Sequence, residues 1–474
     1  MNLSDSRILV IGAGLMGAGI AQVAAQAGHA VQLHDNRPGA AQAAKAKLAQ
    51  TLDGLVAKGR LAADAAAAAL ARITPADTMS GEVDLVIEAI VENLEVKRAL
   101  FAELEALLPA SAVIATNTSS ISVTALARGM NAPERLVGMH FFNPVPLMKL
   151  VEVVSGLGTA PEVAQAVFDL AGRWGKTAVH ARSTPGFIVN RIARPYYAEA
   201  LMLLQARAAA PEVIDACLRA AGFRMGPCEL MDLIGHDTNF AVTNSVFAAN
   251  FFDRRYTPSL VQQELVDAGF LGRKTGRGFY RYPEGAPVLA APRVEPPAPA
   301  ALTVHGRGAV AERLAAGLPE AGREPDSDWV GLTANGLQLR LTDGRRASEF
   351  QASTLVFDLP IGAGPDLAYA ASGDADHAAT WLAACGFTPR RVADVPGLVV
   401  ARTIAMLINE AADAVSQGVC DEAGADAAMK LGVNYPAGPF EWLARWDRRA
   451  VVALLHRLDQ HHRGERYRVS PHLL

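Results

Sequence analysis

The feature that most constrains the fold is a glycine-rich turn near the N-terminus. An apolar run over residues 7–14 leads into GAGLMG, residues 12–17, and a helical pattern follows to about Gly28. In this GxGxxG spacing the first glycine allows a tight turn, the second lets the backbone approach a pyrophosphate, and the third lets the helix pack closely on the strand. The segment therefore predicts a strand–turn–helix unit whose helix N-terminus faces phosphates.

A second apolar run, residues 30–35, ends in Asp35. A carboxylate at this distance from the glycines binds the 2′-hydroxyl of an adenosine ribose and repels a 2′-phosphate, so NAD is favoured over NADP as the cofactor. Arg37 lies close by and weakens this preference slightly. A glycine-rich turn without a ligand is the alternative, but a strand, a helix and Asp35 in the expected order favour a nucleotide site.

Strands and helices alternate up to about His180. Residues 84–93 and 112–120 are further apolar strand-like runs, each followed by a helical segment. This alternation implies a parallel sheet covered on both faces. We therefore predict an α/β Rossmann-like NAD-binding domain over residues 1–184 and an all-α domain over residues 185–285, where β-branched runs become rare.

The helical region has a similar stretch near the C-terminus. PGFIVNRIARPYYAEA, residues 185–200, matches PGLVVARTIAMLINEA, residues 396–411. The all-α domain is therefore predicted to be repeated at the C-terminus, over residues 393–474. Between the two copies we expect a proline-rich linker over residues 286–301 and an irregular or degenerate α/β segment over residues 302–392.

The second helical copy is expected to be structural. Asn190 in the first copy aligns with Ala401 in the second, and the sequence HGRGAVA, residues 305–311, lacks the third glycine of the nucleotide turn. No second His–Glu pair like the one described below accompanies this copy. The sequence therefore predicts one NAD site per chain.

The composition argues against nucleic-acid-binding, membrane-spanning and disulfide-rich proteins. The 474 residues include 44 Lys and Arg against 48 Asp and Glu, and the net charge of −4 argues against a nucleic-acid partner. The uncharged stretch over residues 8–28 contains five glycines and makes a poor membrane span. The four cysteines lie far apart and predict reduced thiols in a cytoplasmic protein, with neither disulfides nor a metal site; they are Cys217, Cys228, Cys385 and Cys420.

Two ionisable residues interrupt apolar strand-like runs within residues 135–154. His140 lies in the first run and Glu152 in the second, with a bend over residues 143–146 between them. Burying either side chain is costly unless it is paired, and a carboxylate beside an imidazole fixes its tautomer and stabilises its protonated form. The pair therefore predicts a proton-transfer unit in a cleft. A satisfied core histidine is the alternative for His140 taken alone.

Two small polar residues also lie in apolar settings. Ser119 follows a strand, at the edge of a parallel sheet where ligands bind, and a helix N-cap is its alternative role. Asn190 lies at the start of an apolar helix, where packing or capping is the alternative. We treat both as candidate site residues.

Seven motifs together resemble the 3-hydroxyacyl-CoA dehydrogenases. They occur in family order over residues 7–282: IGAGLMGAGIA, VIEAIVEN, NTSS, GMHFFNPVPLMKLVEVV, TPGFIVNR, GPCELMDLIGHD and RKTGRGFY. The longer chain with a second helical domain resembles the bacterial subgroup from phenylacetate degradation, which acts on 3-hydroxyadipyl-CoA and has 3-hydroxybutyryl-CoA enzymes as close relatives. The resemblance implies NAD-dependent oxidation of a (3S)-3-hydroxyacyl-CoA to a 3-oxoacyl-CoA.

The resemblance also implies residue roles. His140 would be the general base, Glu152 its orienting partner, and Ser119 and Asn190 the hydrogen-bonding groups around the reacting oxygen and the thioester. The family's CoA contacts, a Ser and a Lys, fall by spacing on Thr51, which departs from Ser, and on Lys58, for which a solvated helix-end charge is the alternative. Besides Ser119, the cofactor set would comprise Gly12, Gly14, Leu15, Met16, Gly17, Asp35, Glu92, Lys97, Asn143 and Lys274.

Two other classes of function remain open at this point. A dehydrogenase for short β-hydroxy acids would use a Lys as its acid–base group, and the His140–Glu152 pair argues against it. A non-catalytic NAD-binding structural protein, like the lens crystallins related to this family, would not need all four catalytic residues intact. The expected partner is an acyl-CoA, without nucleic acid or membrane, and a homo-oligomer is left open. Candidate cations for a distal substrate carboxylate are Arg194, Arg207, Arg224 and Arg254.

Overall fold

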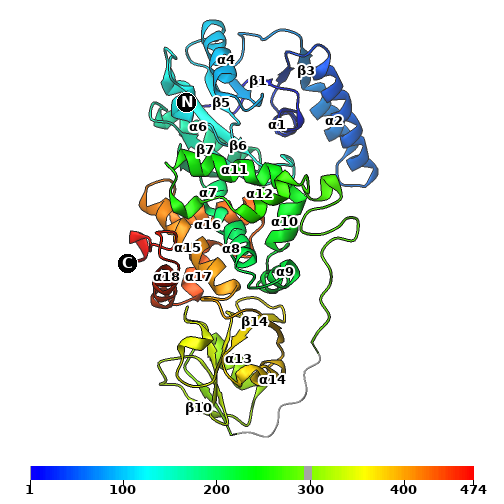
Figure 1. The fold of residues 1–474 in the computed structure, drawn as a ribbon. Coiled ribbons are helices and arrows are strands. Elements are labelled where there is room, and N and C mark those ends of the chain that lie inside the picture. Colours follow the sequence, from blue (N-terminus) through cyan, green and yellow to red (C-terminus); the bar gives the residue numbers. More distant parts are fainter. Residues whose placement is uncertain (1, 293–300) are drawn as a thin grey trace. The chain divides into compact units, whose positions relative to one another are not determined.

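The computed structural model describes residues 2–292 and 301–474 (Figure 1). Residues 293–300, half of the predicted proline-rich linker, lie outside the described residues. The chain divides into two compact units, and we describe each by itself. The first unit comprises Met1–Arg191 with Gln417–Val433, and the second unit comprises Ile192–Ser416 with Asn434–Leu474.

The first unit is built on a sheet of eight strands in the order β3-β2-β1-β4-β5-β6-β7-β8. All neighbouring strands are parallel except β6 and β7, which pair antiparallel with His140 opposite Glu152. This arrangement confirms the predicted Rossmann-like α/β domain. The strands are β1 (Ile8–Ile11), β2 (Val31–His34), β3 (Ile73–Ala76), β4 (Leu85–Glu88), β5 (Val113–Thr116), β6 (Leu136–Phe141), β7 (Leu150–Ser155) and β8 (Thr177–Arg182).

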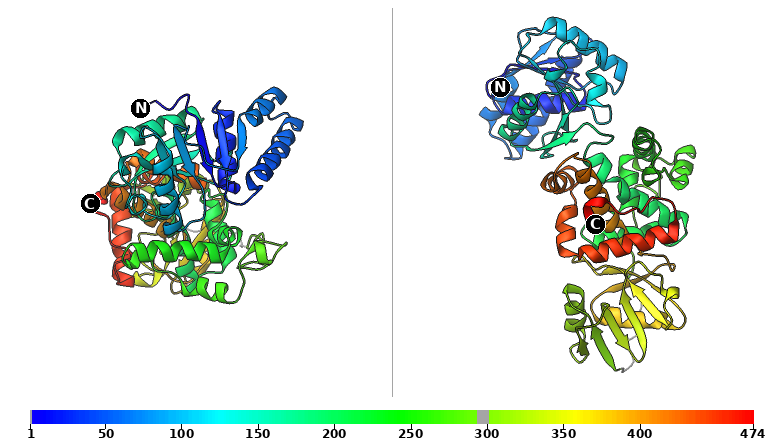
Figure 2. Two further views of the ribbon diagram at one scale, coloured as in Figure 1. Left: turned by 90° about the horizontal axis from the view of Figure 1, so that it is seen from above. Right: turned by 90° about the vertical axis from the view of Figure 1, so that its left-hand side faces the viewer.

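Helices cover both faces of this sheet (Figure 2). Side chains of α1 and α6 share one apolar core with alternate strand residues such as Ile8 and Val10, as the pleat requires. A helix from near the C-terminus, α16 (Glu422–Val433), packs against β7 and β8. The other helices of the unit are α1 (Leu15–Gln26), α2 (Ala40–Ala57), α3 (Ala63–Ala71), α4 (Leu94–Leu107), α5 (Val123–Leu126) and α6 (Pro161–Arg173), while α7 (Val189–Ile192) crosses into the second unit.

The second unit contains a helical part centred on α15 (Val400–Ser416), which packs against α8 (Arg194–Gln205). Every residue from Val400 to Ala414 is buried, as expected of a helix that is covered on all sides. This part confirms the predicted all-α domain after the Rossmann-like domain. Its remaining helices are α9 (Pro211–Ala220), α10 (Pro227–Ile234), α11 (His236–Ala249), α12 (Leu260–Asp267), α17 (Pro439–Arg445) and α18 (Arg448–His462).

Residues 302–392 form a second sheet with its own apolar core, in the order β10-β9-β11-β12-β13-β14-β15. From β12 to β15 the pairings run parallel, antiparallel and parallel, which is the same series as from β5 to β8. The elements are β9 (Leu302–His305), α13 (Ala309–Gly317), β10 (Gly322–Glu324), β11 (Gly331–Ala334), β12 (Leu337–Leu341), β13 (Thr354–Phe357), β14 (Asp366–Ala371), α14 (Ala379–Ala384) and β15 (Thr388–Arg391).

Two buried carboxylates join the helices α8 and α15 to other parts of the second unit. Glu199 on α8 accepts hydrogen bonds from Arg402 Nε at 2.9 Å, Arg466 Nη2 at 3.1 Å and Tyr467 Oη at 2.9 Å. On α15, Glu410 accepts from the Arg255 guanidinium and the Tyr256 hydroxyl. We call these two clusters the Glu199 clamp and the Glu410 clamp. No helix among the described residues is long and apolar enough to cross a bilayer.

Removing the carboxylate of the Glu199 clamp should destabilise the second unit strongly. Glu199→Ala leaves two guanidinium groups, Arg402 and Arg466, close together without their anion, so we expect a loss of about 3–5 kcal/mol in the free energy of unfolding. Urea titration followed by circular dichroism measures it. The control, Glu82→Ala, removes a carboxylate whose side chain is 87% exposed and should change stability by less than about 0.5 kcal/mol. Equal effects of the two variants would contradict the clamp.

Candidate active site

The glycine turn between β1 and α1 has the geometry of a phosphate cradle. Gly12 has a φ of +103°, and a Cβ there would lie 2.4 Å from the Ala89 carbonyl oxygen. A Cβ on Gly17 would lie 1.7 Å from the Gly12 carbonyl oxygen, whereas one on Gly14 would meet nothing within 4 Å. Gly14 is also the N-cap of α1 and offers no side-chain cap, so the first N–H groups of the helix are left for an anion.

A cavity of about 710 Å³ opens beside this turn. The Asp35 carboxylate lies in it and accepts a hydrogen bond from Ala13 N at 2.8 Å, which ties β2 to the turn. A hydrogen bond from the Arg37 side chain lowers the pKa of Asp35 to about 2, so this carboxylate is ionised. An open glycine cradle, an uncapped helix and an ionised acid fit NAD. Other residues lining the cavity include His34, Asn36, Met79, Ile90 and Leu100.

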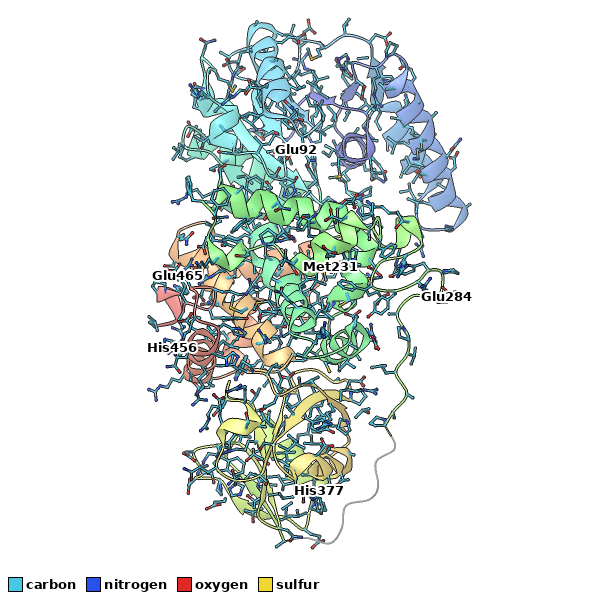
Figure 3. All side chains as sticks on the ribbon, in the orientation of Figure 1. Glu92, Met231, Glu284, His377, His456 and Glu465 are labelled. Atoms are coloured by element: carbon cyan, nitrogen blue, oxygen red, sulfur yellow. The ribbon has the colours of Figure 1, made fainter. Side chains whose placement is uncertain are left out.

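Glu92, which is labelled in Figure 3, follows β4 and contacts the loop that carries Ser119. Its Oε1 accepts from Thr118 Oγ1 at 2.8 Å and from the backbone N–H groups of Ser119 and Ser120 at 2.9 and 3.0 Å. Burial raises the pKa of Glu92, but the hydrogen bond from Thr118 and the charge of Lys97 outweigh it and lower the pKa overall. The loop at the end of β5 is therefore held by an anion.

Lys97 lies deeper than the sequence prediction implies. Its side chain is 1% exposed, with Nζ 2.5 Å from Glu88 Oε1 and 3.4 Å from Glu92 Oε2. This deeply buried side chain pairs with both Glu88 and Glu92, and so it supports the acid that holds the Ser119 loop. The buried Glu88 carboxylate, which the sequence analysis did not single out, is the nearer partner of this ammonium, and the role of Lys97 in the NAD site stays a prediction.

The predicted proton-transfer pair is assembled by the antiparallel pairing of β6 and β7. His140 Nδ1 lies 2.5 Å from Glu152 Oε2, and both side chains are buried. Glu152 also accepts through Oε1 from the backbone N–H groups of Ile188 and Val189, each at 3.0 Å. With Nδ1–H donated to the carboxylate, the lone pair of Nε2 is left to accept a proton. The Phe142 and Phe187 rings lie 4.6 and 5.7 Å from the imidazole.

The Glu152 contact also positions Asn190. The chain turns sharply before α7, with φ values of +79° at Gly186 and +47° at Phe187. The carboxylate holds the two N–H groups that follow this turn, and Asn190 is the next residue, half-buried in the same unit. One acid therefore places both the imidazole and the segment that carries the amide.

A further link was missed by the sequence analysis. Asn117 Oδ1 accepts a hydrogen bond from Phe141 N at 2.8 Å, so the loop that carries Ser119 is tied to the residue after His140. Asn117 is the first residue of NTSS, and its polar side chain directly after a buried strand was the available signal. Asn143 is exposed in the bend between β6 and β7, where a ligand can reach it.

The remaining predicted residues are spread more widely. Leu15 is 69% exposed at the first position of α1, and Met16 follows it, half-buried. Thr51 is exposed on α2 and donates to Lys47 O, four residues back, and Lys58 is the exposed C-cap of that helix. Lys274 belongs to the second unit, where it pairs with Asp237. The roles of Thr51, Lys58 and Lys274 stay predictions.

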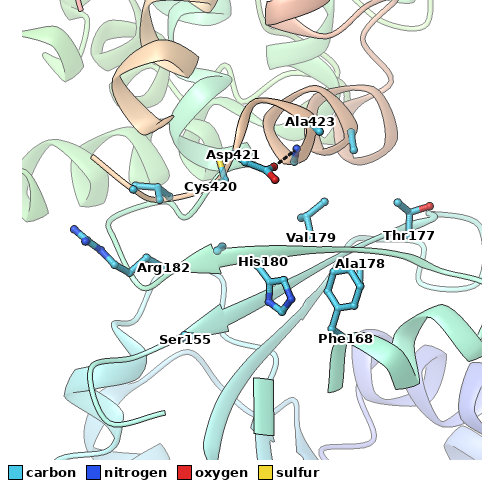
Figure 4. Close-up of a pocket in the computed structure, with 15 residues that line it drawn as sticks. Ser155, Phe168, Thr177, Ala178, Val179, His180, Arg182, Cys420, Asp421 and Ala423 are labelled. Carbon is cyan, nitrogen blue, oxygen red and sulfur yellow. Dashed lines mark hydrogen bonds between the residues drawn. The ribbon is translucent and has the colours of Figure 1, made fainter. Parts of the chain in front are cut away.

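A second cavity in the first unit, of about 590 Å³, lies along β8 beside residues 418–424 (Figure 4). His180 stacks on Phe168 there with ring centroids 4.4 Å apart, and burial lowers the pKa of His180. The cavity contains none of the predicted site residues. Among the described residues, no group of three or more His, Cys, Asp or Glu side chains could hold a metal ion.

Comparison with known proteins agrees with this geometry. Residues 7–184 match the NAD binding domain of 3-hydroxyacyl-CoA dehydrogenase, and residues 186–282 and 397–474 match the C-terminal domain of the same family. The 3-hydroxyadipyl-CoA dehydrogenase of Escherichia coli is 44% identical over 99% of this chain and 96% of its own length. The 3-hydroxybutyryl-CoA dehydrogenase of Bradyrhizobium diazoefficiens is 42% identical over 60% of this chain and 97% of its own length.

A solved structure also covers nearly the whole chain. The crystal structure of a 3-hydroxybutyryl-CoA dehydrogenase from Escherichia coli superposes with a TM-score of 0.91 at 43% identity, covering 99% of this chain and 97% of that one. The resemblance inferred from the seven motifs is thereby confirmed. The chain belongs to the 3-hydroxyacyl-CoA dehydrogenase family and is an NAD-dependent oxidoreductase that converts 3-hydroxyacyl-CoA to 3-oxoacyl-CoA.

Proposed function

We propose that this enzyme oxidises 3-hydroxyadipyl-CoA. The observation that carries the proposal is that its similarity to a relative of that name extends over 99% of the chain, including the part beyond residue 285. The Bradyrhizobium relative named for 3-hydroxybutyryl-CoA covers only 60% of the chain. The second candidate substrate is 3-hydroxybutyryl-CoA, because the similar full-length crystal structure is that of a 3-hydroxybutyryl-CoA dehydrogenase.

Four residues of the first unit have separate roles in the proposed reaction. His140 accepts the proton of the 3-hydroxyl group at Nε2, and the buried Glu152 carboxylate, 2.5 Å from Nδ1, stabilises the imidazolium that forms. The glycine turn and Asp35 would hold NAD, which would supply the acceptor for the hydride that leaves C3. Ser119 and Asn190 orient the reacting oxygen and the thioester from segments held by Glu92 and Glu152. A positioned base supplies about 10²–10⁴ in rate.

Replacing the base should separate catalysis from cofactor binding. We expect His140→Gln to lower kcat about 10³-fold while leaving the NADH dissociation constant within about twofold, because the imidazole belongs to the proton-transfer pair and not to the glycine cradle. The matched control is His180→Gln on strand β8, which should keep near-normal turnover. Steady-state rates with acetoacetyl-CoA and fluorescence titration with NADH measure both quantities. Near-normal turnover of the His140 variant would refute the assignment.

The distal end of the substrate can be tested with a panel of acyl-CoA thioesters. Of the four candidate arginines, Arg194 is buried and lies four residues after Asn190, with its guanidinium 4.9 Å from the Tyr197 ring, whereas Arg207, Arg224 and Arg254 are exposed. We expect kcat/KM for 3-hydroxyadipyl-CoA to exceed that for 3-hydroxyhexanoyl-CoA at least tenfold, and Arg194→Met to abolish most of this difference. A preference for 3-hydroxybutyryl-CoA over both would favour the second candidate substrate.

We also propose that the helical domain occurs twice, with the second copy structural. The members of the Glu199 and Glu410 clamps support this. Glu199 and Glu410, Arg255 and Arg466, and Tyr256 and Tyr467 are each separated by the same number of residues, so each copy supplies the glutamate for one clamp and the arginine–tyrosine pair for the other. Two tethered copies that exchange equivalent contacts in this way behave like a dimer interface within one chain.

The sheet of residues 302–392, which precedes the second helical copy, has no counterpart of the His140–Glu152 pair at the matching strand positions. Asp358, directly after β13, lies opposite Ala368 in the pairing of β13 with β14, as His140 lies opposite Glu152. Its carboxylate accepts from Val399, Val400 and Ala401 N at 2.9, 2.7 and 2.9 Å. One aspartate thus holds the turn that Glu152 holds in the first copy, without an imidazole. Burial raises the pKa of Asp358 to about 6.

This proposal predicts how many NADH molecules bind to each chain. Calorimetric titration of the full-length chain with NADH should give one site per chain, because the turn after β9 lacks the third glycine that lets a helix pack closely on its strand. A Gly17→Ala variant, whose Cβ would clash with the Gly12 carbonyl, should bind none. Two sites in the parent chain, or one site remaining in the Gly17 variant, would contradict a single cofactor site in the first unit.

A further inference from the structure

The carboxylate that should receive the adenosine ribose is already crowded with donors. Asp35 Oδ1 accepts the backbone N–H and the Nε–H of Arg37, both at 3.0 Å. Asp35 Oδ2 accepts Ala13 N at 2.8 Å and Arg37 Nη2 at 3.2 Å. An ionised carboxylate offers about four lone-pair positions, so these donors use all of them.

The hydrogen-bond donors around Asp35 differ in how easily a ligand can displace them. The two backbone N–H groups are fixed by the glycine turn and by the chain after β2. The Arg37 side chain is 70% exposed, whereas the Asp35 side chain is only 8% exposed. An exposed ion pair is weak, because water and salt compete for both groups. A ribose hydroxyl that binds Asp35 therefore displaces the guanidinium and neither of the backbone donors.

We propose that Arg37 competes with the adenosine ribose for Asp35 and, once displaced, is a ligand for a ribose 2′-phosphate, so that this one arginine sets how strongly the enzyme prefers NAD over NADP. Arg37 lines the same cavity as Asp35 and Asn36, beside the glycine turn. A planar guanidinium binds phosphate in a bidentate manner, and it also offsets the repulsion between that phosphate and Asp35. Arg37 thus weakens NAD binding and strengthens NADP binding.

The proposal is tested by binding, independently of turnover. NADH and NADPH dissociation constants are measured by fluorescence titration of the full-length protein. Arg37→Gln should tighten NADH about two- to fivefold, since the competing ion pair is lost, and should weaken NADPH about tenfold, since a charge-assisted phosphate contact is lost. Arg173→Gln removes the same charge from the end of α6 and should change neither constant by more than about twofold.

A double-mutant cycle locates the phosphate. Asp35→Asn should weaken NADH and tighten NADPH about tenfold each, and the gain for NADPH should disappear in the Asp35→Asn, Arg37→Gln double variant. The gain should also shrink as the salt concentration is raised about tenfold, because salt screens the contact between the guanidinium and the phosphate. Because Asp35 also holds Ala13, Arg37→Gln alone, which leaves that contact intact, keeps the test valid if the Asp35 variants fold poorly.

Three results would overturn the proposal. If Arg37→Gln weakens NADH and NADPH equally, the arginine contacts a part that both cofactors share, such as the adenine. If it changes neither, the Arg37–Asp35 pair has no part in recognition. If the NADPH gain of Asp35→Asn survives in the double variant, another group binds the phosphate.

Discussion

Most of the candidate active site depends on one carboxylate, Glu152. One of its oxygens lies 2.5 Å from His140 Nδ1, and the other accepts the N–H groups of Ile188 and Val189. A buried anion is tolerated only when its lone pairs are satisfied, and these three contacts satisfy it. Glu152 therefore sets both the tautomer of His140 and the position of the segment that carries Asn190. Loss of either contact would leave the buried carboxylate with fewer donors.

Acids that follow two other strands also hold backbone N–H groups. Asp35 after β2 holds Ala13 of the glycine turn, and Glu92 after β4 holds the backbone of the loop that carries Ser119. In each case an acid in a short connection accepts N–H groups from a neighbouring connection at the same edge of the sheet. Parallel strands bring these connections together, and fixed backbone donors make the ionised acid stable there. These hydrogen bonds hold the loops in place although the loops have no regular structure of their own.

These contacts explain which features of the molecule could be predicted from the sequence. The glycine turn and the His140–Glu152 pair could be predicted because each depends on spacing and strand periodicity within one short segment. The placement of α16 against β7 and β8 depends on which surfaces far apart in the sequence pack together, and single segments do not show this. Asn117 is an intermediate case. Its polar side chain directly after a strand was visible in the local sequence, but its hydrogen-bond partner, Phe141, lies on another strand and could not be predicted.

Asp358 shows that the two tasks of Glu152 are separable. Its carboxylate starts from the strand position that corresponds to the histidine and still reaches the N–H groups of the turn before α15, so no imidazole is needed to enter the helix. What the turn requires is an acceptor for its N–H groups, because they are buried and have no partner within the helix. The fold therefore requires a carboxylate at this place, whereas the histidine beside it, His140, is found only in the first of the two sheets and is not needed for the turn.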